Sequence, residues 1–192
     1  MTLVGSTVSG ETLIGETSVG TSADQLRSLT LIPPDPVAHK EAVRAIEDAD
    51  MVVIGPGSLF TSIVPNLLIS GITTALANSS AFKVYVSNVA EEPAQTEGYS
   101  VLDHLNVVQH YGGENAVHAV IANSNRPKNP TPAGLDFIRA NKPWHDDVLL
   151  FEVDVIDNSS AERTARHDST KLANAIAEAY RKYRGNRRRL PR

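Results

Sequence analysis

Four apolar runs, separated by segments of helical character, constrain the fold of this chain more than any other feature. They lie near residues 51–54, 83–87, 117–122 and 148–153. Each run is apolar throughout rather than alternating, which is typical of strands that helices cover on both faces. We therefore predict a doubly wound, Rossmann-like α/β fold, a three-layer sandwich in which these four strands are mainly parallel and central in one sheet.

The segments around these runs predict the smaller elements. LVGSTVSGETLIGET reads as an N-terminal β-hairpin that turns at Ser9-Gly10, and LTLIPP at 29–34 as a short strand. Residues 17–28 are weakly patterned and are expected to form a loop. The predicted helices cover 37–48, capped by Asp35 with Pro36 in the first turn, then a region that ends near 78, and then 100–111, 132–140 and 168–183.

Length and charge set the class of protein. The chain has 192 residues, a net charge of -4 and no cysteine. Its length allows one continuous core, so we predict a single α/β domain over residues 1–183. Neither a bilayer-spanning apolar run nor a secretory leader is visible, so we expect a cytoplasmic protein without membrane contact. Residues 184–192 form a basic tail that we expect to be disordered, with nucleic-acid binding as the alternative.

The turn IGPGSLFTS at 54–62 is the strongest local signal for a ligand, because it directly follows an apolar run. Gly55 and Gly57 would allow positive φ and a close approach of the backbone to a ligand. Ser58, Thr61 and Ser62 add hydroxyls beside the main-chain amides of a helix start, a combination that binds phosphate. The alternative is an ordinary strand-to-helix turn, since the sequence matches neither the P-loop nor the dinucleotide fingerprint.

Several segments in a fixed order resemble the gluconeogenesis factor family, within the 2-phospho-L-lactate transferase superfamily. IGPGSLFTSIVPNLLISGI resembles the family's hallmark, preceded by SGETLIGET and followed by KVYVSNVAEEPAQTEGYSVLDHL and RHDSTKLANAI. The resemblance covers residues 3–180 and corresponds to the C-terminal two-thirds of such a protein.

Two departures from the family pattern affect the expected site. The family's Gly-Gly-Gly-Thr-Gly loop and Asp-Asp-Gly-Gly segment have no counterpart, so we expect the chain to hold half of a pocket. In addition, Pro93-Ala94-Gln95-Thr96 stands where the family has Pro-Gly-Glu-Thr, so an amide replaces a carboxylate.

Side chains outside the turn complete the candidate site. Asp103 and His104 match the family's Asp-His pair, for which helix capping and ligand contact are both open. Arg166, beside the expected N-cap Asp168, is the preferred contact for a phosphate or diphosphate, and Arg126 is its alternative. The candidate ligand-binding residues are Gly55, Pro56, Gly57, Ser58, Leu59, Thr61, Ser62, Asn66, Asn88, Thr96, Tyr99, Asp103, His104, Asn123, Arg126 and Arg166. No catalytic residue is assigned, and the spacing of the histidines predicts no metal site.

The resemblance implies a UDP-sugar-binding regulator of carbon metabolism and cell shape rather than an enzyme. Gly-Ser-Leu at 57–59 is typical of the gluconeogenesis factor branch, whereas the transferase branch carries a Gly-Pro-Ser-Asn-Pro type of turn. The alternative is an enzyme that moves a phospho-lactyl group from a nucleotide diphosphate carrier. It would need Mg²⁺ with the diphosphate, yet Glu91, Glu92, Glu97 and Asp103 are not spaced as a metal cage. We expect a UDP-sugar or another nucleotide as ligand, a homo-oligomer, and no cofactor apart from that Mg²⁺.

Overall fold

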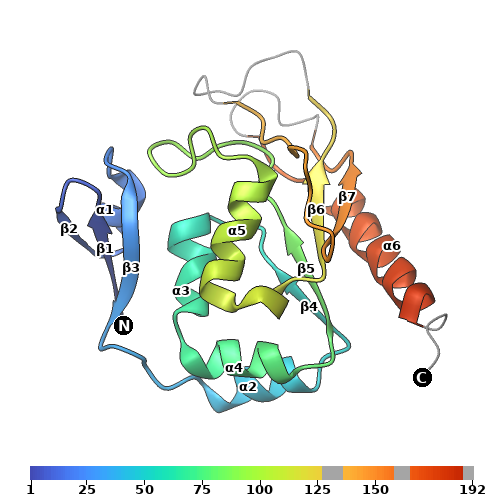
Figure 1. Ribbon diagram of the computed structural model, residues 1–192, viewed down its shortest axis with the longest axis horizontal. Coiled ribbons are helices and arrows are strands. Elements are labelled where there is room, and N and C mark those ends of the chain that lie inside the picture. The colour runs from blue at the N-terminus through green and yellow to red at the C-terminus, as the bar shows by residue number, and fades with distance from the viewer. Residues whose placement is uncertain (127–135, 158–164, 188–192) are drawn as a thin grey trace.

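The computed structural model describes residues 1–126, 136–157 and 165–187. In this part of the chain, a three-stranded antiparallel sheet has the order β2-β1-β3, and a four-stranded sheet has the order β4-β5-β6-β7 (Figure 1). The strands are β1 (Thr2–Thr7), β2 (Thr12–Ile14), β3 (Leu26–Ile32), β4 (Met51–Ile54), β5 (Phe82–Val86), β6 (Ala119–Asn123) and β7 (Leu149–Val153). The helical segments are α1 (Glu16–Thr21), α2 (Lys40–Glu47), the π-helical η1 (Leu59–Ile63), α3 (Val64–Leu67), α4 (Ser70–Asn78), α5 (Val101–Gly112), the 3₁₀ turn η2 (Glu114–Ala116) and α6 (Ser169–Arg187).

The four-stranded sheet consists of the four predicted apolar runs, all parallel, which confirms the predicted α/β class. The strands follow chain order, because each crossover adds the next strand on the same side of the sheet. Only β5 and β6 are therefore central, and the prediction of a central position is wrong for β4 and β7. The reversal of strand order that defines a doubly wound sheet does not occur among the described strands.

Helices cover both faces of the parallel sheet, which explains why its strands are mainly apolar rather than alternating. Successive side chains of a strand point to opposite faces. On β5, Phe82 and Val84 belong to the core cluster that contains Ala179 of α6, whereas Tyr85 belongs to the cluster that contains Leu105 of α5. The predicted three-layer sandwich is therefore confirmed, with α6 on one face and α5 on the other (Figure 1).

The N-terminal sheet confirms the predicted hairpin and corrects the loop expected after it. β1 and β2 pair with Gly5 opposite Leu13, and the turn passes through Gly10 at a φ of +93°. Residues 17–28 are not a loop, since they contain most of α1 and the start of β3. Sequence analysis missed α1 because Val19 is its one buried side chain, so the helix shows no apolar periodicity.

Asp35 caps a different helix from the one expected. α2 begins at Lys40 with His39 as its N-cap, so the predicted start at Asp35 and Pro36 is wrong. Asp35 has a φ of +48°, and its carboxylate accepts a hydrogen bond at 3.1 Å from the N–H of Ser70, in the first turn of α4. The Ser70 side chain, and then its N–H, lower the pKa of Asp35 by hydrogen bonding. The carboxylate therefore stabilises α4, which follows 35 residues later in sequence.

The last helix begins where the sequence predicted and ends later. Asp168 is its N-cap, because the Asp168 Oδ1 accepts a hydrogen bond at 2.8 Å from the N–H of Lys171. α6 continues to Arg187, so the predicted end of this helix at residue 183 is wrong. Residues 188–192 lie outside the described part of the chain.

α5 confirms the helix predicted at 100–111. The helix predicted at 132–140 is wrong over the residues that the structure describes. Residues 136–140 are not helical, and Phe137 forms an antiparallel β-bridge with Ala90 instead. The remainder, 132–135, lies outside the described residues. Among the described helices, no single one has the length and apolar character of a membrane span. The segments Leu59–Leu67 and Ser70–Asn78 have that length and composition only when taken together, and the pair is bent by 74°.

The contact between α4 and the segment before α2 predicts a cost for any side chain at Gly71. A Cβ there would lie 2.6 Å from the Cβ of Ala38. We expect Gly71→Ala to lower the free energy of unfolding by roughly 1 to 3 kcal/mol, because an overpacked site must shift to accept the methyl group.

Gly185→Ala is the matched control for this substitution. Gly185 also lies in a helix, and its Cβ would meet no described atom within 4 Å. This variant should raise the free energy of unfolding by about 0.4 to 1 kcal/mol, because alanine reduces the freedom of the unfolded chain. Urea denaturation measures both values, and a Gly71→Ala variant as stable as Gly185→Ala would contradict the close contact.

Candidate functional site

The carboxyl ends of the parallel strands bring many of the candidate residues to one edge of the sheet. β4 leads into the turn at 55–58, β5 leads to Asn88, and β6 ends at Asn123 (Figure 1). The start of α6 reaches the same edge, since Nε2 of His167 lies 3.1 Å from the carbonyl oxygen of Ser87. This is the edge at which open α/β sheets bind ligands.

Two glycines shape the turn after β4 in different ways. Gly55 has a φ of +84°, and a Cβ on it would lie 3.1 Å from the carbonyl oxygen of Val86. Gly57 does not have a positive φ, so the sequence prediction is wrong for this residue. A Cβ on Gly57 would instead lie 3.3 Å from the Cβ of Ser62. Gly55 alone redirects the chain, and Gly57 allows the turn to approach the helix that follows it.

The donors at the end of this turn already bind an anion, which is the carboxylate of Glu92. The Ser58 hydroxyl donates to Oε1 of Glu92 at 2.5 Å, and the N–H of Leu59 donates to Oε2 at 3.2 Å. Glu92 is held in turn by the buried Thr96, whose hydroxyl accepts the N–H of Glu92 at 2.9 Å. Thr96, a candidate ligand residue in the sequence, therefore positions Glu92, which the sequence analysis did not include among the candidates.

Two fully buried polar side chains, His104 and Tyr85, lie within the field of the Glu92 charge. Nδ1 of His104 lies 2.9 Å from the carbonyl oxygen of Ser100 and so carries the proton, which leaves Nε2 as an acceptor. Neither this Nε2 nor the Tyr85 hydroxyl has a hydrogen-bond partner among the described residues. Burial raises the pKa of Tyr85, and the charge of Glu92 adds to that effect. The region thus holds an unused acceptor and an unused donor, a pattern common at functional sites.

The burial of His104 makes the stability of the protein depend on pH. Burial lowers the pKa of His104, and the bond to Ser100 and the charge of Glu92 oppose this effect without reversing it. As the pH falls below about 6.5, the unfolded chain therefore binds a proton at His104 before the folded protein does. We expect the free energy of unfolding to fall from that pH down to the depressed pKa of the folded state.

Urea denaturation at a series of pH values tests this expectation. His104→Gln should flatten the decline below about pH 6.5. His167, whose pKa burial also lowers, should supply the slope that remains. His39→Gln, at an exposed histidine, is the control for the loss of a histidine as such. A His104→Gln variant with the full wild-type slope would contradict the assignment.

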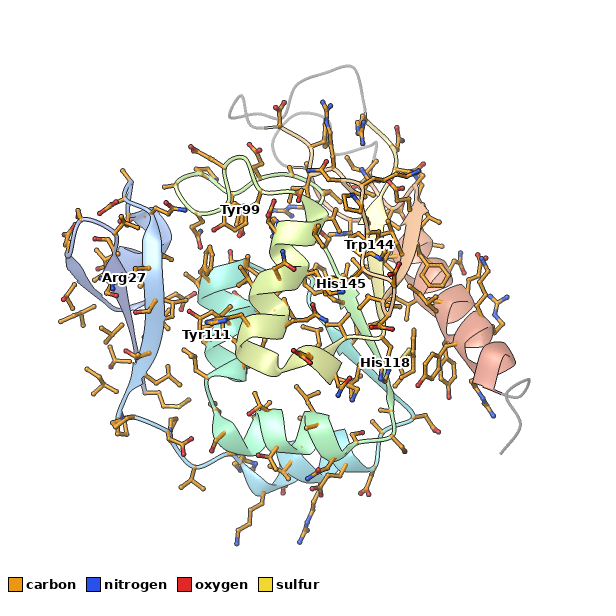
Figure 2. All side chains as sticks on the ribbon, in the orientation of Figure 1. Arg27, Tyr99, Tyr111, His118, Trp144 and His145 are labelled. Atoms are coloured by element: carbon orange, nitrogen blue, oxygen red, sulfur yellow. The ribbon has the colours of Figure 1, made fainter. Side chains whose placement is uncertain are left out.

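Asp103 and His104 have separate roles. Oδ2 of Asp103 accepts the N–H of Ser100 at 2.8 Å, and the Ser100 hydroxyl accepts the N–H of Asp103 at 3.2 Å. This reciprocal pair is a capping box at the start of α5. Capping therefore describes Asp103, whereas His104 points into the core. Tyr99 lies beside the start of α5 (Figure 2). Its ring packs edge-on against that of His104, with 5.7 Å between ring centroids.

The candidates beyond the turn include one structural amide and two free cations. Oδ1 of the buried Asn123 accepts the N–H groups of Asn125 at 3.3 Å and Val155 at 3.2 Å, so it joins the segments that follow β6 and β7. Arg126 and Arg166 are exposed and form no ion pair with a described residue. Of the candidates beyond the turn, the two arginines are thus the cations that an anionic ligand could contact.

The candidates on and around η1 and α3 lie in different environments. Leu59 is fully buried in the core. Pro56, Ser62 and Asn66 are exposed, and Nδ2 of Asn66 donates to the carbonyl oxygen of Ser62 at 2.8 Å. Thr61 and Asn88 are half-buried. The list from the sequence therefore mixes residues that face solvent with residues that hold the fold.

The carboxylates near the turn accept hydrogen bonds from neighbouring segments. Glu91 accepts the N–H of Gly98 at 2.8 Å and that of Asp136 at 3.2 Å, and Glu92 is bound to the turn. Within the described ranges, no group of three or more His, Cys, Asp or Glu side chains could hold a metal ion. Glu91 and Glu92 therefore hold the turn and the loop after β5 in place.

Comparison with known proteins finds relatives of one kind. The model of the family "2-phospho-L-lactate transferase CofD" matches residues 1–160. The "Putative gluconeogenesis factor" of Thermotoga maritima is 37% identical over 147 residues, which are 72% of this chain and 46% of that protein. The "Gluconeogenesis factor" of Halalkalibacterium halodurans is 32% identical over 159 residues, 80% of this chain and 49% of that protein.

A solved structure supports the same relationship. A crystal structure of a UPF0052 family member from Bacillus halodurans matches with a TM-score of 0.82 and 28% identity, over 92% of this chain and 58% of that one. The chain spans about half the length of the curated relatives that it matches. The matched residues include the turn, Glu92 and His104. The chain therefore belongs to the 2-phospho-L-lactate transferase CofD family and is a relative of the gluconeogenesis factors.

Proposed function

We propose that this chain binds a UDP-sugar and regulates carbon metabolism and cell shape rather than catalysing a reaction. Its similarity to proteins named gluconeogenesis factors supports a role in carbon metabolism. The polar turn at the carboxyl edge of the sheet supports a ligand that carries phosphate. The expected uridine and sugar come from the family resemblance alone.

The observation that carries the proposal is the pair of hydrogen bonds from Ser58 and Leu59 to Glu92. A hydroxyl and a main-chain N–H converge there on the two oxygens of one carboxylate. Phosphate oxygens accept hydrogen bonds from the same kind of donors at the start of a helix. η1 and α3 form one helical run, Leu59–Leu67, whose positive end faces the turn. The turn is therefore suited to a phosphate in place of the Glu92 carboxylate.

An incoming phosphate would compete with Glu92. Two anions cannot share the same pair of donors without strong repulsion. We therefore infer that the carboxylate leaves Ser58 and Leu59 when the ligand binds. The exposed guanidinium groups of Arg126 and Arg166 would offset the charge of a second phosphate.

Calorimetric titration tests the proposal directly. UDP-glucose and UDP-galactose should bind saturably and raise the melting temperature of the chain, because a ligand of the folded state stabilises it by mass action. Uridine, which lacks the phosphates, should bind far more weakly. Absence of binding by every UDP-sugar tested would reject the proposal.

The transferase remains a second candidate because the family model carries the name of that activity. A phospho-lactyl transfer from a nucleotide diphosphate carrier would release a nucleoside monophosphate. We favour the regulator, because the curated relatives that match this chain are named gluconeogenesis factors. Release of the monophosphate in the presence of carrier, acceptor and Mg²⁺ would reverse this preference.

A further inference from the structure

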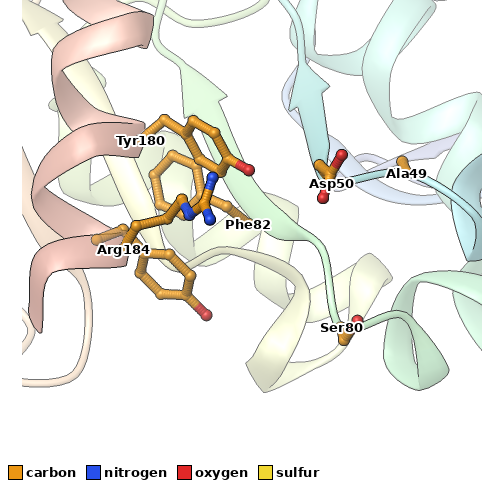
Figure 3. Close-up of a pocket in the computed structure, with 7 residues that line it drawn as sticks. Ala49, Asp50, Ser80, Phe82, Tyr180 and Arg184 are labelled. Carbon is orange, nitrogen blue, oxygen red and sulfur yellow. The ribbon is translucent and has the colours of Figure 1, made fainter. Parts of the chain in front are cut away.

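A hollow with both aromatic and charged lining residues lies at the amino edge of the parallel sheet, where β4 and β5 begin and α6 ends (Figure 3). It has a volume of about 320 Å³, near the lower end of the range for small-molecule sites. Its lining includes Phe82, Tyr180, Tyr183, Arg184 and Asp50. These residues are distinct from those of the turn at the carboxyl edge, so the two sites can be tested separately.

Aromatic rings form one side of this hollow. The ring centroids of Phe82 and Tyr183 are 4.6 Å apart, and those of Phe82 and Tyr180 are 5.9 Å apart. His118 extends the set, since its ring stacks on Tyr183 at 5.2 Å with 14° between the planes. Phe82 is buried, whereas the two tyrosines are half-buried and present ring surface to the hollow. This wall is suited to an aromatic side chain of a ligand.

Opposite charges accompany the aromatic wall. The guanidinium of Arg184 lies over the ring of Tyr180, 5.6 Å from its centroid. Asp50 lies across the hollow from this pair (Figure 3). Both side chains are exposed, and neither forms an ion pair with a described residue. The hollow therefore presents one cation and one anion, both available to a ligand.

From this arrangement we propose that the hollow binds an aromatic α-amino acid in its zwitterionic form. The ligand carboxylate would accept hydrogen bonds from the guanidinium of Arg184, which binds carboxylates in a fixed, forked geometry. The ligand ammonium would donate to the carboxylate of Asp50. The aromatic side chain would pack against Tyr180 and Tyr183. A ligand with only one of the two charges would leave Asp50 or Arg184 without its partner.

The test uses L-phenylalanine and two analogues, 3-phenylpropionate without the ammonium and phenethylamine without the carboxylate. Ligand-observed NMR titration of the 192-residue chain gives the affinities. L-Phenylalanine should bind more tightly than either analogue. Asp50→Asn should weaken L-phenylalanine about tenfold and leave 3-phenylpropionate unchanged. Arg184→Gln should weaken both of these about tenfold and leave phenethylamine unchanged. Tenfold is the low end for a charge-assisted hydrogen bond, because both groups are exposed.

Matched controls place the effect in the hollow. Asp48→Asn and Arg181→Gln remove exposed charges of the same kind from neighbouring positions that do not line it. These variants should bind L-phenylalanine as the wild type does, with melting temperatures showing that all variants fold. The proposal is overturned if the wild type does not bind L-phenylalanine, if the analogues bind equally well, or if the controls weaken binding as much as Asp50→Asn and Arg184→Gln. Whether or not L-phenylalanine binds in this hollow, the result does not bear on UDP-sugar binding at the opposite edge of the sheet.

Discussion

Replacement of Gly55 by valine is expected to lower the free energy of unfolding by roughly 2 to 5 kcal/mol. Two costs add at this position. The φ of +84° is unfavourable for a side chain with a Cβ, at roughly 1 to 2 kcal/mol. The new Cβ would also lie 3.1 Å from the carbonyl oxygen of Val86 and 3.3 Å from Cδ1 of Ile63, which adds the roughly 1 to 3 kcal/mol of an overpacked site. Urea denaturation at neutral pH measures the sum.

Gly10→Val separates the two costs. Gly10 has a similar φ of +93°, but a Cβ on it would meet no described atom within 4 Å. In this variant the free energy of unfolding should fall only by the conformational cost of the positive φ, roughly 1 to 2 kcal/mol. If Gly55→Val were no less stable than Gly10→Val, the close approach of the turn to β5 would be wrong. The comparison also shows how firmly the turn is fixed before any ligand binds.

The architecture of the parallel sheet could be predicted because its signal is local. β5 and β6 are buried along their whole length, and the apolar side chains that form most of both strands indicate that burial directly in the sequence. The N-terminal region has no such signal. Thr17, Ser18 and Gly20 of α1 are poor helix formers, and the helix depends on the packing of Val19 against residues that are distant in sequence. Tertiary contact therefore decides its structure.

The carboxylate of Asp35 illustrates a limit of capping rules. An aspartate before a proline is a common start of a helix, so the sequence favours Asp35 as the cap of the helix that directly follows it. The chain instead reaches a φ of +48° at Asp35 and directs the carboxylate to Ser70. A cap between distant segments leaves no pattern in one sequence, because the donor and the acceptor are set by the tertiary fold.

The same limit applies to the candidate site. The sequence identifies the turn at 55–58, because two glycines and a serine follow an apolar strand. It does not pair Ser58 with Glu92, which lies 34 residues later. Nor does it reveal that His104 keeps a buried nitrogen without a partner. Both features arise from the packing of the loop after β5 against η1 and α5, so only the structure shows them.

Ser58→Ala and Glu92→Gln are expected to change UDP-sugar affinity in opposite directions if the proposed function is correct. Ser58→Ala removes a hydroxyl that would donate to a charged phosphate oxygen. The loss should be about 1.5 to 3 kcal/mol, or roughly tenfold to a hundredfold in affinity. Glu92→Gln removes the internal anion that occupies the same donors. Affinity should then rise about tenfold, since a like charge at the phosphate position is costly.

The opposite signs distinguish a phosphate contact from a purely structural role of Ser58. If Ser58 served only to hold Glu92 in place, Ser58→Ala would release the carboxylate from the turn and Glu92→Gln would remove its charge, so both substitutions would shift affinity in the same direction. Calorimetric titration of UDP-glucose into the wild type and both variants gives the signs, and melting temperatures confirm that each variant is folded. Thr74→Ala, which removes an exposed hydroxyl from α4, is the control for the loss of a hydroxyl. Weaker binding in both Ser58→Ala and Glu92→Gln would make Glu92 part of the ligand contact rather than its competitor. Unchanged affinity in both would remove the turn from the site and transfer the phosphate contact to Arg126 or Arg166.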